Sequence, residues 1–106
     1  DYVHVTDLAQ AHLLGLKHMQ ENKGFSAFNL GNSDGFSVME IINGCEVAAN
    51  RRIPYEVDER RKGDPSVLVA ENSLAKSVLG WKPAYYKINE IIDSAWNWHK
   101  KMDYKK

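Results

Sequence analysis

Cysteine is almost missing from the sequence, with Cys45 the single one among 106 residues. One cysteine cannot close a disulfide within the chain, and its position in a helical apolar pattern predicts a buried, reduced thiol. Small secreted domains often depend on disulfides, whereas cytoplasmic proteins rarely contain them. The cysteine content therefore excludes a disulfide-stabilised scaffold and favours a cytoplasmic location.

Long apolar runs and a surplus of one charge are also absent. No run approaches the ~18 apolar residues of a membrane-spanning helix, so no contact with a membrane is expected. Fourteen basic residues balance fourteen acidic ones, which argues against nucleic acid as a partner. Any site for a polyanion must therefore be local.

The chain begins without an initiator methionine or a signal peptide. Its first residues, 1–5, have the pattern of a strand whose neighbours lie elsewhere, so we expect a fragment of a longer protein. Hydrophobic residues make up 43% of the chain and charged residues 26%, which is typical of a globular protein and not of a disordered one.

Four helices are predicted from the helical spacing of apolar side chains. The second has the clearest start, because Ser37 and Glu40 form a capping box in which each side chain binds the other residue's backbone N–H. Thr6 or Asp7 can cap the first helix, and Gly80 can end the third. The predicted helices cover residues 7–20, 38–50, 72–79 and 88–101.

Short strands are predicted between the helices, at residues 1–5, 25–30 and 53–57. Pro54 places the last of them at a sheet edge, because proline cannot donate to a strand ladder. The strands are too few for a complete parallel sheet. The fold class expected is therefore α/β, mostly helical with a few short strands.

The most informative polar segment is the charged loop at residues 58–66. Arg60, Arg61 and Lys62 are adjacent and are followed by Gly63 and Asp64. A guanidinium can hold a phosphate through two parallel hydrogen bonds, glycine permits a positive φ, and a carboxylate can accept from a sugar diol. The loop is compatible with a phosphorylated ribose ligand, although a solvated charged turn would have the same composition.

Other candidate sites are weaker. Residues 31–35, Gly-Asn-Ser-Asp-Gly, could bind phosphate, but they lack the Walker lysine and the three-glycine dinucleotide pattern, so a strand-to-helix turn is favoured. The four histidines have no metal-ligand spacing, and no metal site is expected. The aromatic residues near the C-terminus are interpreted as packing groups and not as a stacking platform. They are Trp81, Tyr85, Tyr86, Trp96 and Trp98.

Several segments together resemble UDP-glucose 4-epimerases of the extended short-chain dehydrogenase/reductase family. They occur in the family's order and spacing and cover nearly the whole chain. The loop with Arg-Arg-x-Gly-Asp is the most specific of them. The segments are Asp1-Tyr2-Val3-His4-Val5-Thr6-Asp7-Leu8-Ala9, Phe28-Asn29-Leu30-Gly31, Arg60-Arg61-Lys62-Gly63-Asp64-Pro65 and Leu79-Gly80-Trp81-Lys82-Pro83.

The resemblance implies a two-part enzyme. In this family an N-terminal Rossmann domain binds NAD, and a C-terminal part closes over UDP-glucose or UDP-galactose. A hydride passes from the sugar C4 to NAD and returns to the opposite face of the 4-keto sugar. Residues 1–106 are then expected to be the C-terminal UDP-sugar-binding part of a nucleotide-sugar epimerase, with the NAD-binding domain absent.

Four substrate-binding residues follow from the resemblance. Arg61 looks like the family arginine on the UDP phosphates, and Asp64 looks like the carboxylate on the uridine ribose. Tyr2 and Val38 match positions that line the nucleotide end of the pocket. Neither the Gly-rich NAD loop nor a Tyr-x-x-x-Lys pair in a catalytic context is present. The resemblance therefore implies no catalytic or cofactor-binding residue here, and no activity of the isolated chain.

Two other functions stay open at this point. The parent protein could be a related nucleotide-sugar epimerase, dehydratase or decarboxylase, or the chain could be a free-standing nucleotide-sugar-binding or interaction domain without chemistry. For an epimerase parent we expect a cytoplasmic homodimer. The unpaired first strand could also let the isolated chain self-associate.

Overall fold

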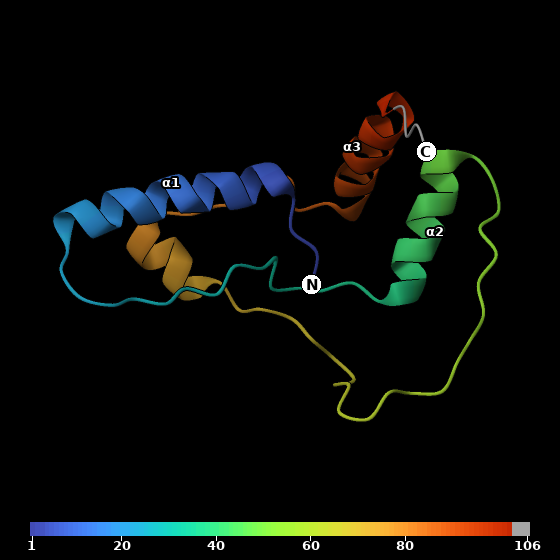
Figure 1. Cartoon of the computed structure of the whole chain (residues 1–106), viewed down its shortest axis with the longest axis horizontal. Coiled ribbons are helices and arrows are strands. Elements are labelled where there is room, and N and C mark those ends of the chain that lie inside the picture. The colour runs from blue at the N-terminus through green and yellow to red at the C-terminus, as the bar shows by residue number, and fades with distance from the viewer. Residues whose placement is uncertain (103–106) are drawn as a thin grey trace.

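The computed structural model describes residues 1–102, which form four helices joined by extended segments. Figure 1 shows α1 beside the short η1 on one side of the molecule, and α2 beside α3 on the other. The four predicted helices are therefore confirmed. The helices are α1 Val5–Glu21, α2 Val38–Ala49, η1 Ala75–Leu79 and α3 Ile88–Lys101.

The α1 helix begins earlier than predicted because His4, and not Thr6 or Asp7, is its cap. The ring Nδ1 of His4 accepts a hydrogen bond from the backbone N–H of Thr6 at 3.1 Å. The carboxylate of Asp7 is buried and accepts from the backbone N–H groups of Ala84 and Tyr85 at 2.9 and 3.0 Å. Asp7 thereby fixes the start of α1 to the segment that leads into α3.

The capping box predicted for α2 is confirmed. The backbone N–H of Glu40 donates to the Ser37 hydroxyl at 3.1 Å, and the backbone N–H of Ser37 donates to the Glu40 carboxylate at 2.8 Å. The helix ends at Asn50, which adopts the left-handed conformation with φ 52°. Two of the four unpaired N–H groups at the helix start are satisfied in this way.

The η1 element is a π-helix that occupies the C-terminal part of the predicted 72–79 helix, and it ends as expected. Gly80 has φ 70°, and the backbone N–H groups of Gly80 and Trp81 donate to the carbonyls of Lys76 and Ala75 at 3.1 and 3.2 Å, so a left-handed glycine closes the last turn. Just before the element, the carboxylate of Glu71 accepts from the hydroxyl and the backbone N–H of Ser73 at 2.6 and 2.7 Å. These two hydrogen bonds lower the pKa of the Glu71 carboxyl below its ordinary value.

The core of the described residues lies between α1 and η1. Ala11, Ala75 and Trp81 are buried, and the Trp81 indole N–H donates to the Asp7 carbonyl at 2.8 Å. Trp81 is thus a packing group, as expected, whereas Trp98 is 61% exposed. Apolar side chains from several segments surround this core, namely Val3, Leu14, Phe28, Leu30 and Leu79.

The helices of the second pair, α2 and α3, pack against each other, with the Ile92 side chain close to Gly44. Four isoleucines of these helices are half-buried, namely Ile41, Ile42, Ile91 and Ile92. Cys45 lies in the same region and is a free thiol. It is half-buried, whereas a buried thiol was predicted. In residues 1–102, no helix combines the length and apolar character that a membrane crossing requires.

The strands predicted at 1–5, 25–30 and 53–57 are wrong for this chain, because none of the described residues forms a strand. A strand needs a neighbour with which to exchange backbone hydrogen bonds, and the three segments do not pair with one another. Residue 5 instead begins α1. The apolar residues Phe28 and Leu30 still face the core, although the backbone that carries them is only extended.

Candidate functional site

A hollow of about 800 Å³ lies where three segments of the chain approach one another. One wall is formed by Asp1 and Tyr2, the second by the turn at 34–36 with the start of α2, and the third by the loop at 61–69. Hollows of ~300–1,000 Å³ are typical of ligand sites. Its walls therefore come from residues that lie far apart in the sequence.

The charged loop contributes Arg61 and Asp64 to this hollow. The Arg61 Nε lies 2.8 Å from an Asp64 carboxylate oxygen, and the side chains are 86% and 40% exposed. Gly63, between them, has φ 88°, the conformation for which glycine was expected here. The ion pair uses one of five guanidinium donors, so four N–H groups of Arg61 are not used by Asp64.

Tyr2 and Val38 lie in the same hollow, on its other two walls. Their side chains are 37% and 68% exposed. An aromatic ring and a branched aliphatic group that stay open to solvent could contact the flat faces of a base. The structure thus brings together the four residues singled out from the sequence, while their roles stay predictions.

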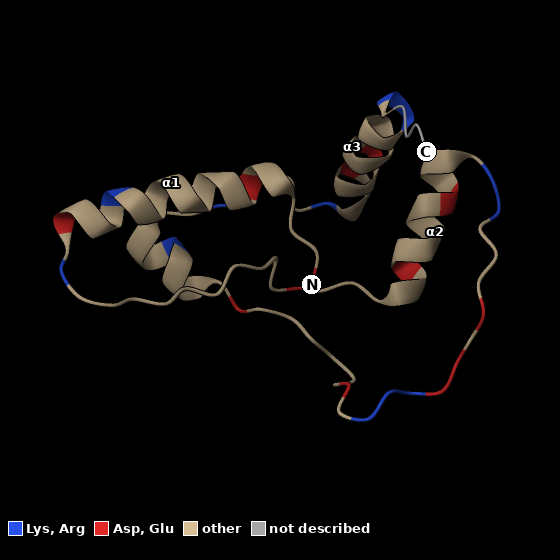
Figure 2. Cartoon of the chain, viewed as in Figure 1, with Lys and Arg blue, Asp and Glu red and all other residues tan. Residues whose placement is uncertain are grey.

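Arg60 and Lys62 do not line the hollow, although they flank Arg61 in sequence. Figure 2 shows the basic run at the outer end of the long loop between α2 and η1. Both side chains are exposed. Within the basic triplet, Arg61 is therefore the cation best placed for a ligand in the hollow.

Three further carboxylates line the hollow that were not predicted as site residues from the sequence, at Asp1, Asp34 and Glu40. Glu40 was recognised only as a helix cap, and Asp1 only as part of an opening segment. With Asp64 they bring to four the carboxylates that line the hollow together with Arg61. The sequence contains no pattern that indicates their shared location, because the hollow forms only where the folded chain brings these segments next to the long loop.

The turn at residues 31–35 leads directly into the cap of α2, as expected, although no strand precedes it. The backbone N–H of Asp34 donates to the Asn32 carbonyl at 2.8 Å, and Ser33 has φ 67°. Asp34 and Gly35 line the hollow. This turn therefore shapes one wall of the hollow, with Asp34 adding a negative charge.

The described residues do not fit a dinucleotide cofactor. A Rossmann site needs parallel strands and a three-glycine turn between a strand and a helix, and residues 1–102 contain neither. Groups of three or more histidine, cysteine or carboxylate side chains able to hold a metal ion are likewise absent from residues 1–102.

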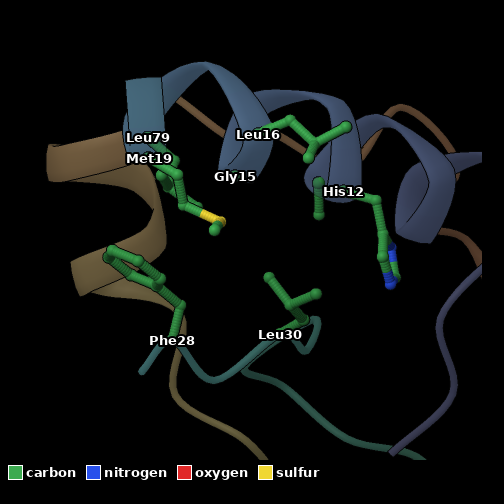
Figure 3. A pocket seen from close by; sticks show the side chains of 8 residues that line it. His12, Gly15, Leu16, Met19, Phe28, Leu30 and Leu79 are labelled. Atoms are coloured by element: carbon green, nitrogen blue, oxygen red, sulfur yellow. The ribbon is translucent and has the colours of Figure 1, made fainter. Parts of the chain in front are cut away.

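A second, apolar hollow of about 400 Å³ runs along α1. Figure 3 shows Leu16, Met19, Phe28 and Leu30 with their side chains around it, and His12 at one end. Its lining offers almost no hydrogen-bonding groups, so it lacks the polar contacts that orient a nucleotide. The polar hollow is the better candidate for a functional site.

The sequence is similar to those of curated UDP-glucose 4-epimerases. No protein-family model matches the sequence. The UDP-glucose 4-epimerase of Lacticaseibacillus casei is 50% identical over 99 residues, which cover 93% of this chain and 30% of that protein. The chain spans about 30% of the length of the curated relatives that it matches.

Solved structures of UDP-glucose 4-epimerases also resemble this chain. A crystal structure of a UDP-glucose 4-epimerase superposes with a TM-score of 0.90 at 49% identity, over all of this chain and 33% of that one. The UDP-glucose 4-epimerase of Bifidobacterium longum, in complex with NAD+ and UDP, gives a TM-score of 0.86 at 40% identity, over 95% and 30% of the two chains. The resemblance to UDP-glucose 4-epimerases, and the fold class as a portion of such a protein, are confirmed.

Proposed function

We propose that residues 1–106 form the UDP-sugar-binding part of a UDP-glucose 4-epimerase, with the NAD-binding Rossmann domain supplied by polypeptide outside this chain. The observation that carries the proposal is the convergence of Tyr2, Val38, Arg61 and Asp64 on one hollow. These residues come from three segments of the chain, so their convergence depends on the fold. The similarity to epimerases supports the same assignment.

In this proposal each of the four residues has a separate role. The free guanidinium donors of Arg61 bind the UDP phosphates, and the Asp64 carboxylate accepts from the ribose hydroxyls. The Arg61–Asp64 contact at 2.8 Å orients both groups before the ligand arrives. Tyr2 and Val38 flank the nucleotide end. The chain thus binds and orients the substrate and takes no part in proton or hydride transfer.

The charge around the hollow supports a shared site. Four carboxylates and one guanidinium line it, and a diphosphate would add further negative charge. Carboxylates without nearby cations oppose such a ligand. We infer that a second phosphate-binding cation comes from polypeptide outside this chain, and that the isolated chain binds UDP poorly.

The activity of the whole protein is part of the same proposal. It interconverts UDP-galactose and UDP-glucose through a 4-keto intermediate, with NAD bound by the absent domain, as a cytoplasmic homodimeric isomerase. The NAD present in the structure from Bifidobacterium longum supports the cofactor. Assay of the intact protein with UDP-galactose should yield UDP-glucose. Binding of UDP without turnover would instead favour a non-catalytic protein or a related enzyme of different sugar specificity.

Substitution of Arg61 tests the site directly. In the intact protein, Arg61→Ala should weaken UDP binding by about 1.5–3 kcal/mol, the contribution of a hydrogen bond to a charged group. Isothermal titration with UDP measures the change. Arg60→Ala is the matched control, because it removes the same charge from a side chain outside the hollow, and it should change the affinity much less. Equal affinities of the wild type and Arg61→Ala would remove Arg61 from the site.

A further inference from the structure

We infer that Asp1 is a positioning residue for the nucleotide site, holding in register the three segments that form its walls. The inference rests on the proposed function, because it concerns the same hollow. Asp1 lines that hollow beside Tyr2, yet its carboxylate makes its contacts with the protein backbone. It acts on the ligand through other residues.

The Asp1 carboxylate joins the segments through two backbone hydrogen bonds. One oxygen accepts from the N–H of Asn32 at 3.3 Å, and the other accepts from the N–H of Ala70 at 2.9 Å. The backbone nitrogen of Asp1 also donates to the Leu68 carbonyl at 3.0 Å. A single residue therefore bridges the chain start, the turn before α2 and the end of the long loop.

Neighbouring amide side chains reinforce this junction. The side-chain amide of Asn32 donates to the Tyr2 carbonyl, which fixes the backbone of a predicted ligand contact. The side-chain amide of the buried Asn72 donates to the Gly31 carbonyl. Every bond joins segments at least thirty residues apart, so the junction substitutes for the strand ladder that these extended segments do not form.

The junction controls the geometry of the site because the walls of the hollow leave directly from it. Residues 34–36 follow Asn32, while Leu68 and Val69 precede Ala70, and the same loop carries Arg61 and Asp64. Loop residues around Arg61 are exposed and lack a core of their own. Loss of the Asp1 bonds would let this loop sample positions in which Arg61 is outside the hollow, and the apparent affinity falls with the competent fraction.

The direction in which one substitution changes the UDP affinity distinguishes a positioning role of Asp1 from an electrostatic one. Asp1→Asn removes a negative charge from a hollow proposed to bind phosphate, and electrostatics alone would then tighten UDP binding. It also places an amide where two backbone N–H groups need acceptors. Positioning therefore predicts weaker binding, by about tenfold, as for one charge-assisted hydrogen bond. The KM for UDP-galactose should rise to the same extent, with kcat nearly unchanged.

The experiment uses the intact protein and titration with UDP. Asp58→Asn is the matched control, because Asp58 lies on the long loop but accepts only from the adjacent Glu59 N–H at 2.7 Å; its affinity should stay near that of the wild type. Asp1→Glu keeps the charge but moves the carboxylate by one methylene away from the Asn32 and Ala70 N–H groups, so it should also bind UDP more weakly than the wild type, although less so than Asp1→Asn. It also provides the decisive measurement if Asp1→Asn does not fold.

A double-mutant cycle with Arg61→Ala provides the second readout. If Asp1 acts by placing Arg61, the double variant should lose less affinity than the two single losses combined. Unchanged or tighter binding by Asp1→Asn, or by Asp1→Glu where that variant decides, would overturn the inference, and so would an additive cycle. Failure of the wild type to bind UDP would instead refute the proposed function, before any variant is compared.

Discussion

At the scale of single residues, Gly31 allows two segments to approach it closely. It is buried, and a Cβ built on it would lie 2.6 Å from the Ala70 carbonyl oxygen and would also meet the Asp1 carboxylate. Because the first of these is a backbone atom, no side-chain rotation can relieve the contact. The junction around Asp1 therefore requires a residue without a side chain at this position.

Gly31→Ala should lower the free energy of unfolding by about 1–3 kcal/mol, the usual cost of forcing extra atoms into a packed site. Urea unfolding measures it. The matched substitution is Gly15→Ala, since a Cβ at Gly15 has no neighbour within 4 Å and the residue lies inside α1. It should raise the free energy of unfolding by about 0.5–1 kcal/mol. A Gly31→Ala variant as stable as the wild type would show that the segments can separate at little cost.

Residues that act through local chemistry could be predicted from the sequence, and those that act over long distances could not. The capping pair Ser37 and Glu40 and the cap Gly80 depend on neighbours within a few positions. Asp7 was predicted as a cap, but it binds the backbone at Ala84 and Tyr85 instead. The spacing of apolar residues could not predict these partners of Asp7, because only the folded chain brings them together.

At the scale of elements, α2 depends on its capping box. Ser37→Ala removes the acceptor for the Glu40 N–H and should lower the free energy of unfolding by about 1 kcal/mol, as at other N-caps. Thermal unfolding followed by circular dichroism measures the loss. Ser37→Asp restores an acceptor at the same position and should recover most of the stability. Equal stability of the Ser37→Ala variant would mean that packing against α3 alone holds the helix.

Helices were predictable at this scale because their hydrogen bonds are internal, whereas the predicted strands required partners. The alternation at Phe28 and Leu30 correctly indicated which side chains face the core. It could not indicate whether a neighbouring strand is present. The segment therefore stays extended and unpaired, and hydrogen bonds from Asn32 and Asn72 hold the turn that follows it.

At the scale of the whole molecule, the chain exposes far more surface than a compact protein of its mass. Its accessible area is 8941 Å², compared with about 6,000 Å² expected for 12.1 kDa. Its radius of gyration is 17.0 Å, compared with about 13 Å for a compact domain of this length. The exposed apolar residues along α1, including Leu13, Leu16 and Met19, contribute to this excess.

The isolated chain should therefore self-associate, because exposed apolar surface drives association. Sedimentation velocity at several concentrations measures the sedimentation coefficient, which should rise with concentration. Leu16→Glu, in the apolar hollow along α1, should weaken the association by about tenfold, on the scale of burying one leucine. Leu13→Glu is the control, because Leu13 is similarly exposed but does not line that hollow. A concentration-independent monomer would contradict the prediction.

The bonds from Asp7 to the segment before α3 have a mechanical consequence. Residues 1–102 show no direct packing of α1 or η1 against α2 or α3, so the two helix pairs meet through directional polar contacts and the stacked rings of His4 and Tyr85. The placement of α1 relative to α3 therefore depends on a few directional contacts. Because Tyr2 precedes α1 and Val38 begins α2, which packs against α3, the separation of these two walls of the hollow depends in part on the same contacts.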